Sequence, residues 1–333
     1  MKRGLAAAVA ILLVVVGTAP LAVGSGLAAE NVTVTVKTVD SDGDPRGPVT
    51  FTATWDGGQV EKTTTESSGE ALFEVPEGAE VTVEITDDRF TRNEPFVIEE
   101  ATGGDVEVPV ALSGMATVTV TEEGSGVADA NVVVSRAGTD VDAGTTGSDG
   151  TFETDPIETG KYTIEVSKPG YYGNTTTVTV AQQTRTTVPI ESGAVDVKFN
   201  VTDDHFDTAR PLGDVKIAIP SVGTTLTTIE NGKQSLTLPV NRDYEVSFSK
   251  DGYQSETTTL SVEEDDVTFD VSMQRVPELT LETLNEQVVV GERTRITATN
   301  EYDEPVANAT VTVDGESVGE TDARGQFDVR VES

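Results

Sequence analysis

The only histidine of the chain, His205, lies in the segment VTDDHFDTARPLG beside Asp203, Asp204 and Asp207. An imidazole beside carboxylates could ligate a transition metal or serve as the base of a catalytic triad. A metal site of that kind usually has a second imidazole or a thiolate, and the sequence contains neither. A serine nucleophile would need a G-x-S-x-G turn, which is also missing from the sequence. We therefore expect no catalytic residue and no cofactor, and a solvated loop around His205.

The segment DSDGDPRG spaces Asp40, Asp42 and Asp44 as oxygen ligands of Ca²⁺ are often spaced. An EF-hand loop has glycine at its sixth position and glutamate at its twelfth. Here Gly43 stands at the fourth position and Phe51 at the twelfth. The three aspartates are therefore weak candidates for an irregular metal site, and the sequence predicts no other.

Trp55, in the segment FTATWDGG, is the only tryptophan and a candidate ligand platform. The tyrosines after Gly170 and Gly252 are further candidates for sugar binding. Trp55 is in phase with Phe51 and Ala53, which favours a position that closes a core. The alternative is an exposed platform on which a sugar ring stacks.

Four sequons of the form Asn-x-Ser/Thr are candidate glycosylation sites on an exported chain. They begin at Asn31, Asn174, Asn200 and Asn308.

The net charge of −36, from 58 acidic and 22 basic residues, excludes a general nucleic-acid-binding surface, which would have to be basic. The acidic residues are spread along the whole chain, as in proteins adapted to molar salt, although an ordinary acidic surface protein remains the alternative. The lack of cysteine excludes disulfides, thiolate metal sites and a cysteine nucleophile.

The first 29 residues have the pattern of an export signal. Lys2 and Arg3 precede an apolar run, and the segment ends in GSGLAA. Small residues at Gly26 and Ala28 predict cleavage near Ala28–Ala29, and hence a protein at the cell surface or outside the cell. An uncleaved membrane anchor is the alternative, and it would be the chain's one contact with a membrane.

The elements that would position these residues are β-strands. NVTVTV, MATVTVT, AVDVKFNV and VTFDVSM alternate apolar and polar residues, which is typical of half-buried strands. Turn segments such as SDGD, GSDG, ENGK and KDGY recur between them. The pattern predicts an all-β chain of tandem antiparallel β-sandwiches behind a helical signal segment.

Nearly the same sequence segment recurs at a distance of about one small domain. KPGYYGNTTTVTV begins at Lys168, KDGYQSETTTLSV begins at Lys250, and a fainter copy ends at Phe90. The repeat predicts sandwiches over residues 30–113, 114–192 and 193–276, and a fourth, incomplete one over 277–333.

The pattern G-x-F/L followed by G-x-Y-x-(I/V)-x-V-x-K-x-G-Y resembles the carboxypeptidase regulatory-like domain, a transthyretin-like or CnaB-like Ig-type sandwich. The second segment carries the resemblance best. The third replaces the DG-x-F turn by ENGKQSL, and the first matches poorly throughout. In that family the domain is usually an accessory or a stalk, so the resemblance implies a protein that is not an enzyme. Together with the export signal and the even acidic charge, we expect an exported surface protein of the halophilic archaeal type.

Three functions remain open. The first is a non-catalytic surface protein that acts as a spacer or binding array. The others are the accessory part of a larger exported enzyme, such as a peptidase, and a carbohydrate-binding adhesin. The expected partner is a surface protein or a glycan, and not a nucleic acid.

The fourth segment differs from the second at its end. GTFETDP at 150–156 is followed by the segments YTIEV and TTTVTV, whereas GQFDVRV at 325–331 is followed only by Glu332 and Ser333. We expect an open sheet edge there. The chain is cut short, or another molecule donates a strand, or the extra residues 277–302 close the sheet differently.

Overall fold

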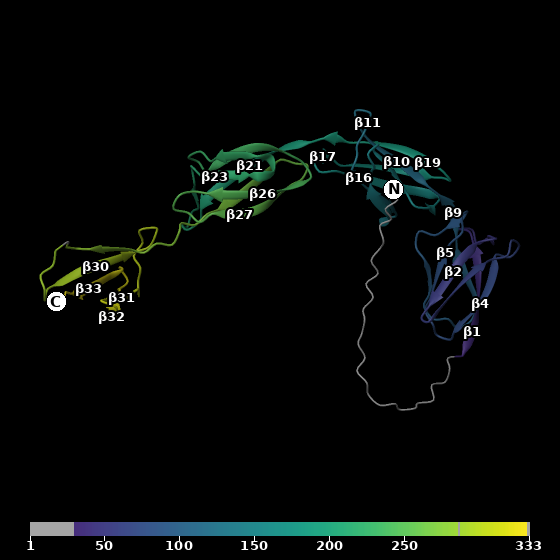
Figure 1. Cartoon of the computed structure of the whole chain (residues 1–333), viewed down its shortest axis with the longest axis horizontal. Helices are drawn as coiled ribbons and strands as arrows, with labels where there is room; N and C mark the ends of the chain where they lie inside the picture. The colour runs from purple at the N-terminus through teal and green to yellow at the C-terminus, as the bar shows by residue number, and fades with distance from the viewer. Residues whose placement is uncertain (1–29, 286, 332–333) are drawn as a thin grey trace, which may run out of the picture. The chain divides into compact units, whose positions relative to one another are not determined.

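The computed structural model describes residues 30–285 and 287–331 (Figure 1), so the predicted signal segment and its cleavage site lie outside the described residues. The chain divides into two compact units, of which the first ends at Ser113 and the second begins at Gly114. Strands make up almost all of the regular structure, with one 3₁₀ turn, η1 (Pro220–Val222), among the described residues. The all-β prediction is therefore confirmed.

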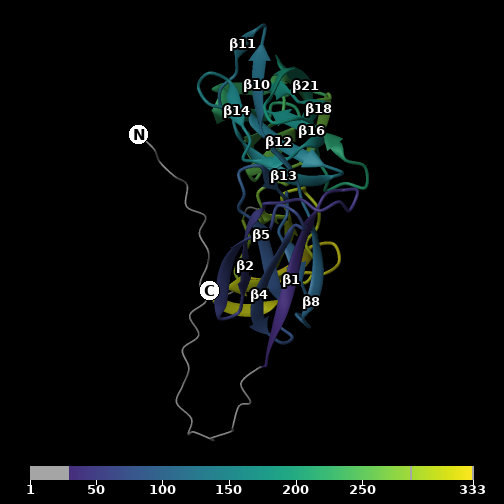
Figure 2. The same cartoon turned by 90° about the vertical axis from the view of Figure 1, so that its right-hand side faces the viewer.

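The first unit is a sandwich of two sheets. One sheet has the order β4 (Glu70–Pro76), β1 (Asn31–Val39), β8 (Gly104–Pro109), strands that Figure 2 shows side by side. The other has the order β3 (Gly58–Thr63), β2 (Thr50–Trp55), β5 (Val81–Ile85), β7 (Phe96–Ile98). The short strands β6 (Phe90–Thr91) and β9 (Ala111–Gly114) pair with each other. Every second residue of β1 and β2 faces the core, as the period of two predicted.

The second unit begins with a sandwich within residues 114–192. One sheet has the order β11 (Ser125–Gly126), β10 (Ala116–Glu122), β14 (Thr151–Glu153), and β19 (Thr184–Pro189) also pairs with β10. The other has the order β13 (Thr139–Thr145), β12 (Asn131–Arg136), β16 (Gly160–Ser167), β18 (Asn174–Val180). The short strands β15 (Ile157–Glu158), β17 (Tyr171–Tyr172) and β20 (Glu191–Ser192) complete it.

The strands between 194 and 272 repeat this layout. One sheet has the order β22 (Arg210–Pro211), β21 (Ala194–Asp203), β25 (Lys233–Pro239), with β28 (Val267–Ser272) paired to β21. The other has the order β24 (Thr224–Thr227), β23 (Lys216–Ile219), β26 (Arg242–Ser249), β27 (Glu256–Val262). Its core is the largest of the chain's described cores and includes the buried Tyr244 and Phe248.

The last sandwich has fewer strands. One sheet has the order β29 (Thr280–Thr283), β30 (Arg293–Thr299), β33 (Gln326–Arg330), and β31 (Thr310–Val313) pairs with β32 (Glu316–Glu320). We propose that the four sandwiches are four domains with the predicted limits. The strand pairs within 114–331 support this division, because each stays inside one predicted domain.

The sheets are mostly antiparallel, as predicted, with one parallel strand pair in each of the first three sandwiches. β8, β19 and β28 each run parallel to the first strand of their sandwich. The reason is that the chain crosses to the other sheet before its last strand and then runs alongside the first strand in the same direction. Such a crossover leaves no local sequence signal.

A buried threonine fixes the same turn in each sandwich. In the second, the Thr146 hydroxyl donates to the Val127 carbonyl (2.6 Å) and accepts from the Ala130 N–H (2.9 Å). Thr228 makes the same two bonds, to Leu212 (2.7 Å) and from Val215 (3.0 Å). Thr321 repeats both, and Thr64 accepts from Val49.

A glycine four or five residues after each of these threonines has a positive φ. It is 65° at Gly69, 78° at Gly150, 74° at Gly232 and 69° at Gly325. The interpretation that the third sandwich has lost this turn is therefore wrong, because ENGK keeps the glycine that the backbone requires. In the sequence, a threonine followed four or five residues later by glycine would have predicted this turn in all four sandwiches.

Candidate functional site

The repeated Lys-x-Gly-Tyr turn has a structural role at each position. Lys168 Nζ donates to the Ala128 carbonyl (2.6 Å), and Gly170 has a φ of 88°. The Tyr171 hydroxyl donates to Glu122 Oε2 (3.2 Å), at the end of the first strand of the sandwich. The turn thus joins the end of β16 to the loop before β12 and to the end of β10.

The third sandwich repeats these contacts with its own residues. Lys250 Nζ donates to the Gly213 carbonyl (2.7 Å), and the Tyr253 hydroxyl donates to Asp203 Oδ2 (3.1 Å). Phe90, which stands at this position in the first sandwich, has no hydroxyl and packs in a small core beside Val49 and Val110. The Lys-x-Gly-Tyr segment recurs because the same turn closes the same end of each of these two sandwiches.

The turn of the second sandwich also contacts the third. The Gly170 N–H donates to the Val240 carbonyl (2.8 Å), and Asn241 Nδ2 donates to the Tyr171 carbonyl (2.8 Å). Glu264 accepts from the Gly173 N–H (2.7 Å) and from Asn241 (2.8 Å). These bonds hold the pKa of Glu264 below its usual range, since they favour its charged form.

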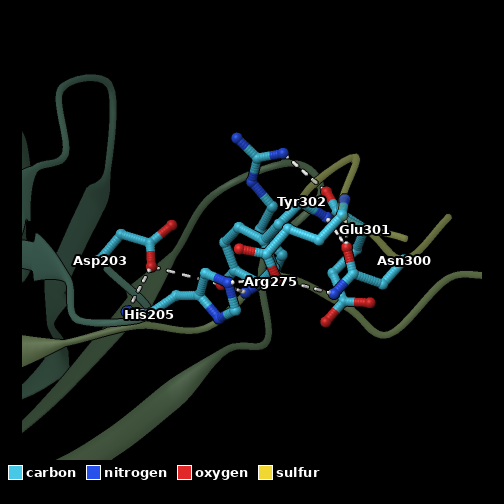
Figure 3. Close-up of polar contacts among 7 residues, drawn as sticks. Asp203, His205, Arg275, Asn300, Glu301 and Tyr302 are labelled. Carbon is cyan, nitrogen blue, oxygen red and sulfur yellow. Dashed lines mark hydrogen bonds and ion pairs between the residues drawn. The ribbon is translucent and has the colours of Figure 1, made fainter. Parts of the chain in front are cut away.

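At the next junction, between the third and fourth sandwiches, His205 has a defined environment (Figure 3). Its ring stacks on Tyr302, with centroids 3.6 Å apart and planes 5° from parallel. Its Nε2 lies 3.0 Å from Glu304 Oε2. Residues 204, 205 and 207–209 are exposed between β21 and β22, in keeping with the predicted solvated loop, but a residue 97 positions later stacks on the His205 ring.

Asp203 is the buried centre of this junction. It is 1% exposed, and it accepts from the His205 N–H (3.1 Å), the Tyr253 hydroxyl (3.1 Å) and the Tyr302 hydroxyl (3.3 Å). Burying a carboxylate is costly unless donors surround it, and three donors do so here. Tyr302 is therefore bound through both its ring and its hydroxyl, and burial raises its pKa.

Arg275 connects the two sandwiches from the segment between them. Its Nη1 donates to the Glu301 carbonyl (2.7 Å), and its guanidinium lies 4.9 Å from the Tyr302 ring centroid. Its backbone N–H donates to the Tyr302 hydroxyl (3.0 Å). We call Asp203, His205, Tyr253, Arg275, Tyr302 and Glu304 the junction cluster. Its chemistry is hydrogen bonding, ring stacking and cation–π contact, which suits the joining of two domains.

Hydrogen bonds within the junction cluster shift the pKa values of Glu304 and Arg275. The hydrogen bond from His205 is the main reason that the pKa of Glu304 lies below its usual range. The bond to the Tyr253 hydroxyl raises the pKa of Arg275. Sequence reasoning missed this cluster, and the one available signal was the aromatic Tyr302 in a loop rich in polar residues.

The three aspartates of the first loop do not converge on an empty site. Asp40 Oδ1 accepts from the N–H groups of Asp42 and Asp44 (3.0 Å each), and its Oδ2 pairs with Arg46. Within residues 30–285 and 287–331, no group of three or more acidic or histidine side chains could hold a metal ion. The candidate metal site therefore gains no support from the geometry.

Trp55 lies at the open side of the first sandwich, between an edge strand of each sheet. It stacks against Phe73, with centroids 6.3 Å apart and planes at 16°, and it is half-buried. Gly58 lies against the indole, where an added Cβ would come within 2.7 Å of the ring. Trp55 thus closes the core and also borders a shallow surface with Val60 and Leu72.

The four sequons differ in exposure. Asn31 and Asn308 are exposed, and Asn308 has a φ of 58° in a turn. The side-chain amide of Asn174 donates to the Pro189 carbonyl (2.6 Å), and that of Asn200 donates to Asp270 (2.8 Å). Asn31 and Asn308 are therefore the more accessible acceptors.

A search for membrane-crossing helices covered the described residues, and none of the length and apolar character needed was found.

Comparisons with known proteins give one family match. Residues 115–191 match the model of the carboxypeptidase regulatory-like domain, in the segment where the sequence resemblance is strongest. No curated protein sequence matches the chain.

Several solved structures are similar. The Bacillus anthracis TIE protein has 16% identity and a TM-score of 0.29, with 73% of this chain and 50% of that chain covered, so the match spans half of that protein. A Streptococcal ancillary pilin has 12% identity and a TM-score of 0.27, with 75% and 100% covered. BcpA, the major pilin subunit of Bacillus cereus, has 11% identity and a TM-score of 0.21, with 74% and 100% covered.

Proposed function

We propose that the chain is a non-catalytic protein of the cell surface, in which tandem β-sandwiches form a spacer or binding array outside the cell. The observation that carries this proposal is the double use of one turn. Lys-x-Gly-Tyr closes its own sandwich through Glu122 or Asp203. In the second sandwich the same turn also contacts the following sandwich, through Asn241. In the third, Asp203, which accepts from Tyr253 of the turn, also accepts from Tyr302 of the following sandwich.

A spacer needs this kind of joint. Contacts between successive domains limit the freedom of the links, so that the end of the array is held away from its origin. The match of residues 115–191 to a regulatory-like domain supports an accessory role rather than a catalytic one. The even acidic charge supports a protein of the halophilic type, with Asn31 and Asn308 as its most exposed glycan acceptors.

The test is made on cells that produce the chain. A membrane-impermeant amine reagent should label the protein on intact cells, and the N-terminus of the labelled form should lie near Ala29 or Glu30. A protein that is labelled only after lysis, with Met1 intact, would contradict the proposal.

A carbohydrate-binding adhesin is a second candidate, and the surface beside Trp55 is the observation that favours it. Leu72 is 56% exposed there, next to the half-buried indole. Glycan-array binding that is lost in Trp55→Phe and kept in Tyr172→Phe would support this candidate. The accessory part of a larger exported enzyme remains the third proposal, tested by co-purification of the chain with an exported hydrolase activity.

A further inference from the structure

A shallow groove crosses the outer face of the third sandwich, over β21 and β25. Its volume is about 390 Å³, which lies in the range of small-ligand sites. It is lined by Lys198 and Lys233 together with Ile229, Ser235 and Thr268. Ile229 is 61% exposed and adds an apolar surface. Two of the nine lysines of a chain with a net charge of −36 therefore border one groove.

The strand register makes these two lysines neighbours. Lys198 pairs opposite Ser235, and Asn200 pairs opposite Lys233, so Lys198 and Lys233 are diagonal neighbours on the exposed face of the sheet. Diagonal neighbours of this kind lie about 7–8 Å apart. On its other side Lys198 lies opposite Thr268 of β28. A single anion can therefore lie between the two ammonium groups.

A shared backbone bond shows which residues of the other sandwiches hold the same positions. The N–H groups of Thr38, Val201 and Ala298 donate to the carbonyls of Gly69, Gly232 and Gly325, each at 2.8 Å. Counted from these bonds, Lys198 corresponds to Arg295 of the fourth sandwich. Lys233 corresponds to Glu70 of the first. The second sandwich has Thr117 and Thr151 at these two positions.

In the first and fourth sandwiches a cation on this face has an acidic partner on the neighbouring strand. Arg295 Nε donates to Asp328 Oδ1 (2.8 Å), and Lys37 Nζ lies 3.3 Å from Glu70 Oε1. In the third sandwich Ser235 stands at the position of Asp328, and Lys233 stands at the position of Glu70. Both carboxylates that could neutralise this face are therefore replaced, one of them by a second cation.

The two lysines find no other partner. Within residues 30–285 and 287–331, neither ammonium group makes an ion pair or a hydrogen bond. The strands of this face carry two carboxylates, and both are bonded within the sheet. Asp196 accepts from the Thr237 hydroxyl (2.8 Å), and Asp270 accepts from the Asn200 amide (2.8 Å). The groove therefore complements a negative charge that the sandwich itself does not supply.

The other groups of the groove favour a sugar over a peptide. The hydroxyls of Ser235 and Thr268 are exposed and make no hydrogen bond in the described structure. A peptide that adds a strand needs a free sheet edge, whereas β21 is paired on both sides, with β25 and β28. A sugar acid carries a carboxylate and several hydroxyls on one ring, which matches ammonium and hydroxyl groups side by side.

We propose that this groove binds a carboxylated oligosaccharide. Its carboxylate lies between Lys198 and Lys233 and accepts a charge-assisted hydrogen bond from each. Its ring hydroxyls bond to Ser235 and Thr268, and the apolar side of a ring contacts Ile229. The amide of Asn200, which is bonded to Asp270 on the neighbouring strand, leaves the space beside Lys233 free.

The proposal deepens the proposed function, since it names a ligand class for the binding array. It rests on that function only for the location outside the cell. The test below uses purified protein, so its failure is distinguishable from a wrong cellular location.

The probe is a trimer of galacturonic acid. The full chain is produced in a host without N-glycosylation, so that Asn200 is unmodified, and is titrated in molar KCl while its amide signals are followed by NMR. We expect the signals of Lys198, Lys233, Ser235 and Thr268 to shift and those of the first sandwich to stay in place. The methyl ester of the same trimer lacks the charge and should bind at least about tenfold more weakly.

Two double variants test the lysines. Lys198→Gln with Lys233→Gln should weaken binding of the trimer at least about tenfold, because both charge-assisted hydrogen bonds are lost. Lys161→Gln with Lys216→Gln is the matched control. Both of these lysines are exposed outside the groove, and the net charge changes by the same amount, so the affinity should stay the same.

A gain of charge gives a test that does not depend on truncating a side chain. Ser235→Asp places a carboxylate opposite Lys198, as Asp328 stands opposite Arg295. It should weaken binding of the trimer about tenfold and keep the melting temperature, because the new carboxylate takes the place of the ligand's.

Three results would overturn the proposal. The first is equal affinity for the trimer and its methyl ester. The second is an equal loss of affinity in the two double variants, which would mean that only the overall charge matters. The third is binding of a hexamer of glutamate at the same residues and with the same affinity, which would make an acidic polypeptide the occupant.

Discussion

At the scale of single residues, Thr228 shows that the fold depends on buried hydrogen bonds as well as on apolar contacts. Its hydroxyl is the partner of two backbone groups, the Leu212 carbonyl and the Val215 N–H, and the side chain is 2% exposed. A buried backbone group that loses its partner costs about 1–3 kcal/mol. The repeated threonines therefore hold the loop before the second strand in place.

We predict that Thr228→Val destabilises the chain by about 2–4 kcal/mol, because both backbone groups lose their partner while the volume of the side chain is kept. Urea unfolding followed by circular dichroism measures the change. Thr227→Val is the matched control, since Thr227 is exposed on β24 and should change stability by less than about 0.5 kcal/mol. Equal effects of the two substitutions would contradict the role given to the hydroxyl.

At the scale of elements, strand ends are where neighbouring sandwiches meet. β21 ends at Asp203, β28 is followed by Arg275, and the loop after β30 carries Tyr302. The Tyr302 hydroxyl links the other two residues, because it donates to Asp203 and accepts from the backbone N–H of Arg275. The order of this joint therefore depends on charged and polar groups and responds to pH.

The folded-state pKa of Glu304 is depressed, mainly by its bond to His205. Its contribution is present above the pKa that it has in the unfolded chain and is lost as pH falls through its folded-state pKa. We predict that, at pH values below the ordinary pKa of a glutamate, the amides of Arg275 and Tyr302 exchange faster than their intrinsic rates explain. Glu304→Gln should remove part of this pH dependence.

Asp314→Asn is the matched control for this prediction, because Asp314 is an exposed turn residue of the same sandwich. It should leave the exchange profile of Arg275 unchanged. A joint whose exchange is the same from acidic to neutral pH in the parent chain would exclude the role of Glu304.

At the scale of the whole molecule, charge is the dominant feature. The formal net charge is −36, and a compact state brings these like charges together. Salt screens the repulsion, with a Debye length of about 10 Å at 0.1 M and about 3 Å at 1 M. Stability is thus expected to depend on ionic strength.

We predict that the melting temperature rises by more than about 10 °C between low and molar KCl. Sorbitol is the control, because it lacks charge and leaves the repulsion unscreened. A rise that sorbitol reproduces, or no rise in KCl, would contradict the interpretation of the charge as an adaptation to salt.

The division into two units at Ser113 and Gly114 gives a second prediction at this scale. Limited proteolysis should cut near residues 113–114 before it cuts within β10 or β21. Mass spectrometry identifies the first fragments. Early fragments that begin inside a sandwich core would argue against independent units.

The sequence by itself determined the strands. Side chains alternate between the two faces of a strand, so the buried positions of β1, β21 and β26 were readable from a period of two. It also determined that KPGY and KDGY form one kind of turn, because a glycine with positive φ and a following aromatic residue are local requirements.

Only the tertiary structure decided which distant groups meet. His205 and Tyr302 stack across 97 residues, and no periodic pattern links them. β19 pairs parallel with β10, and β28 pairs parallel with β21. Both pairings follow from a crossover of the chain between the two sheets. Within the described residues β31 pairs with β32 alone, which is visible only once its neighbours are in place, because a free edge is a property of the sheet and not of any one strand.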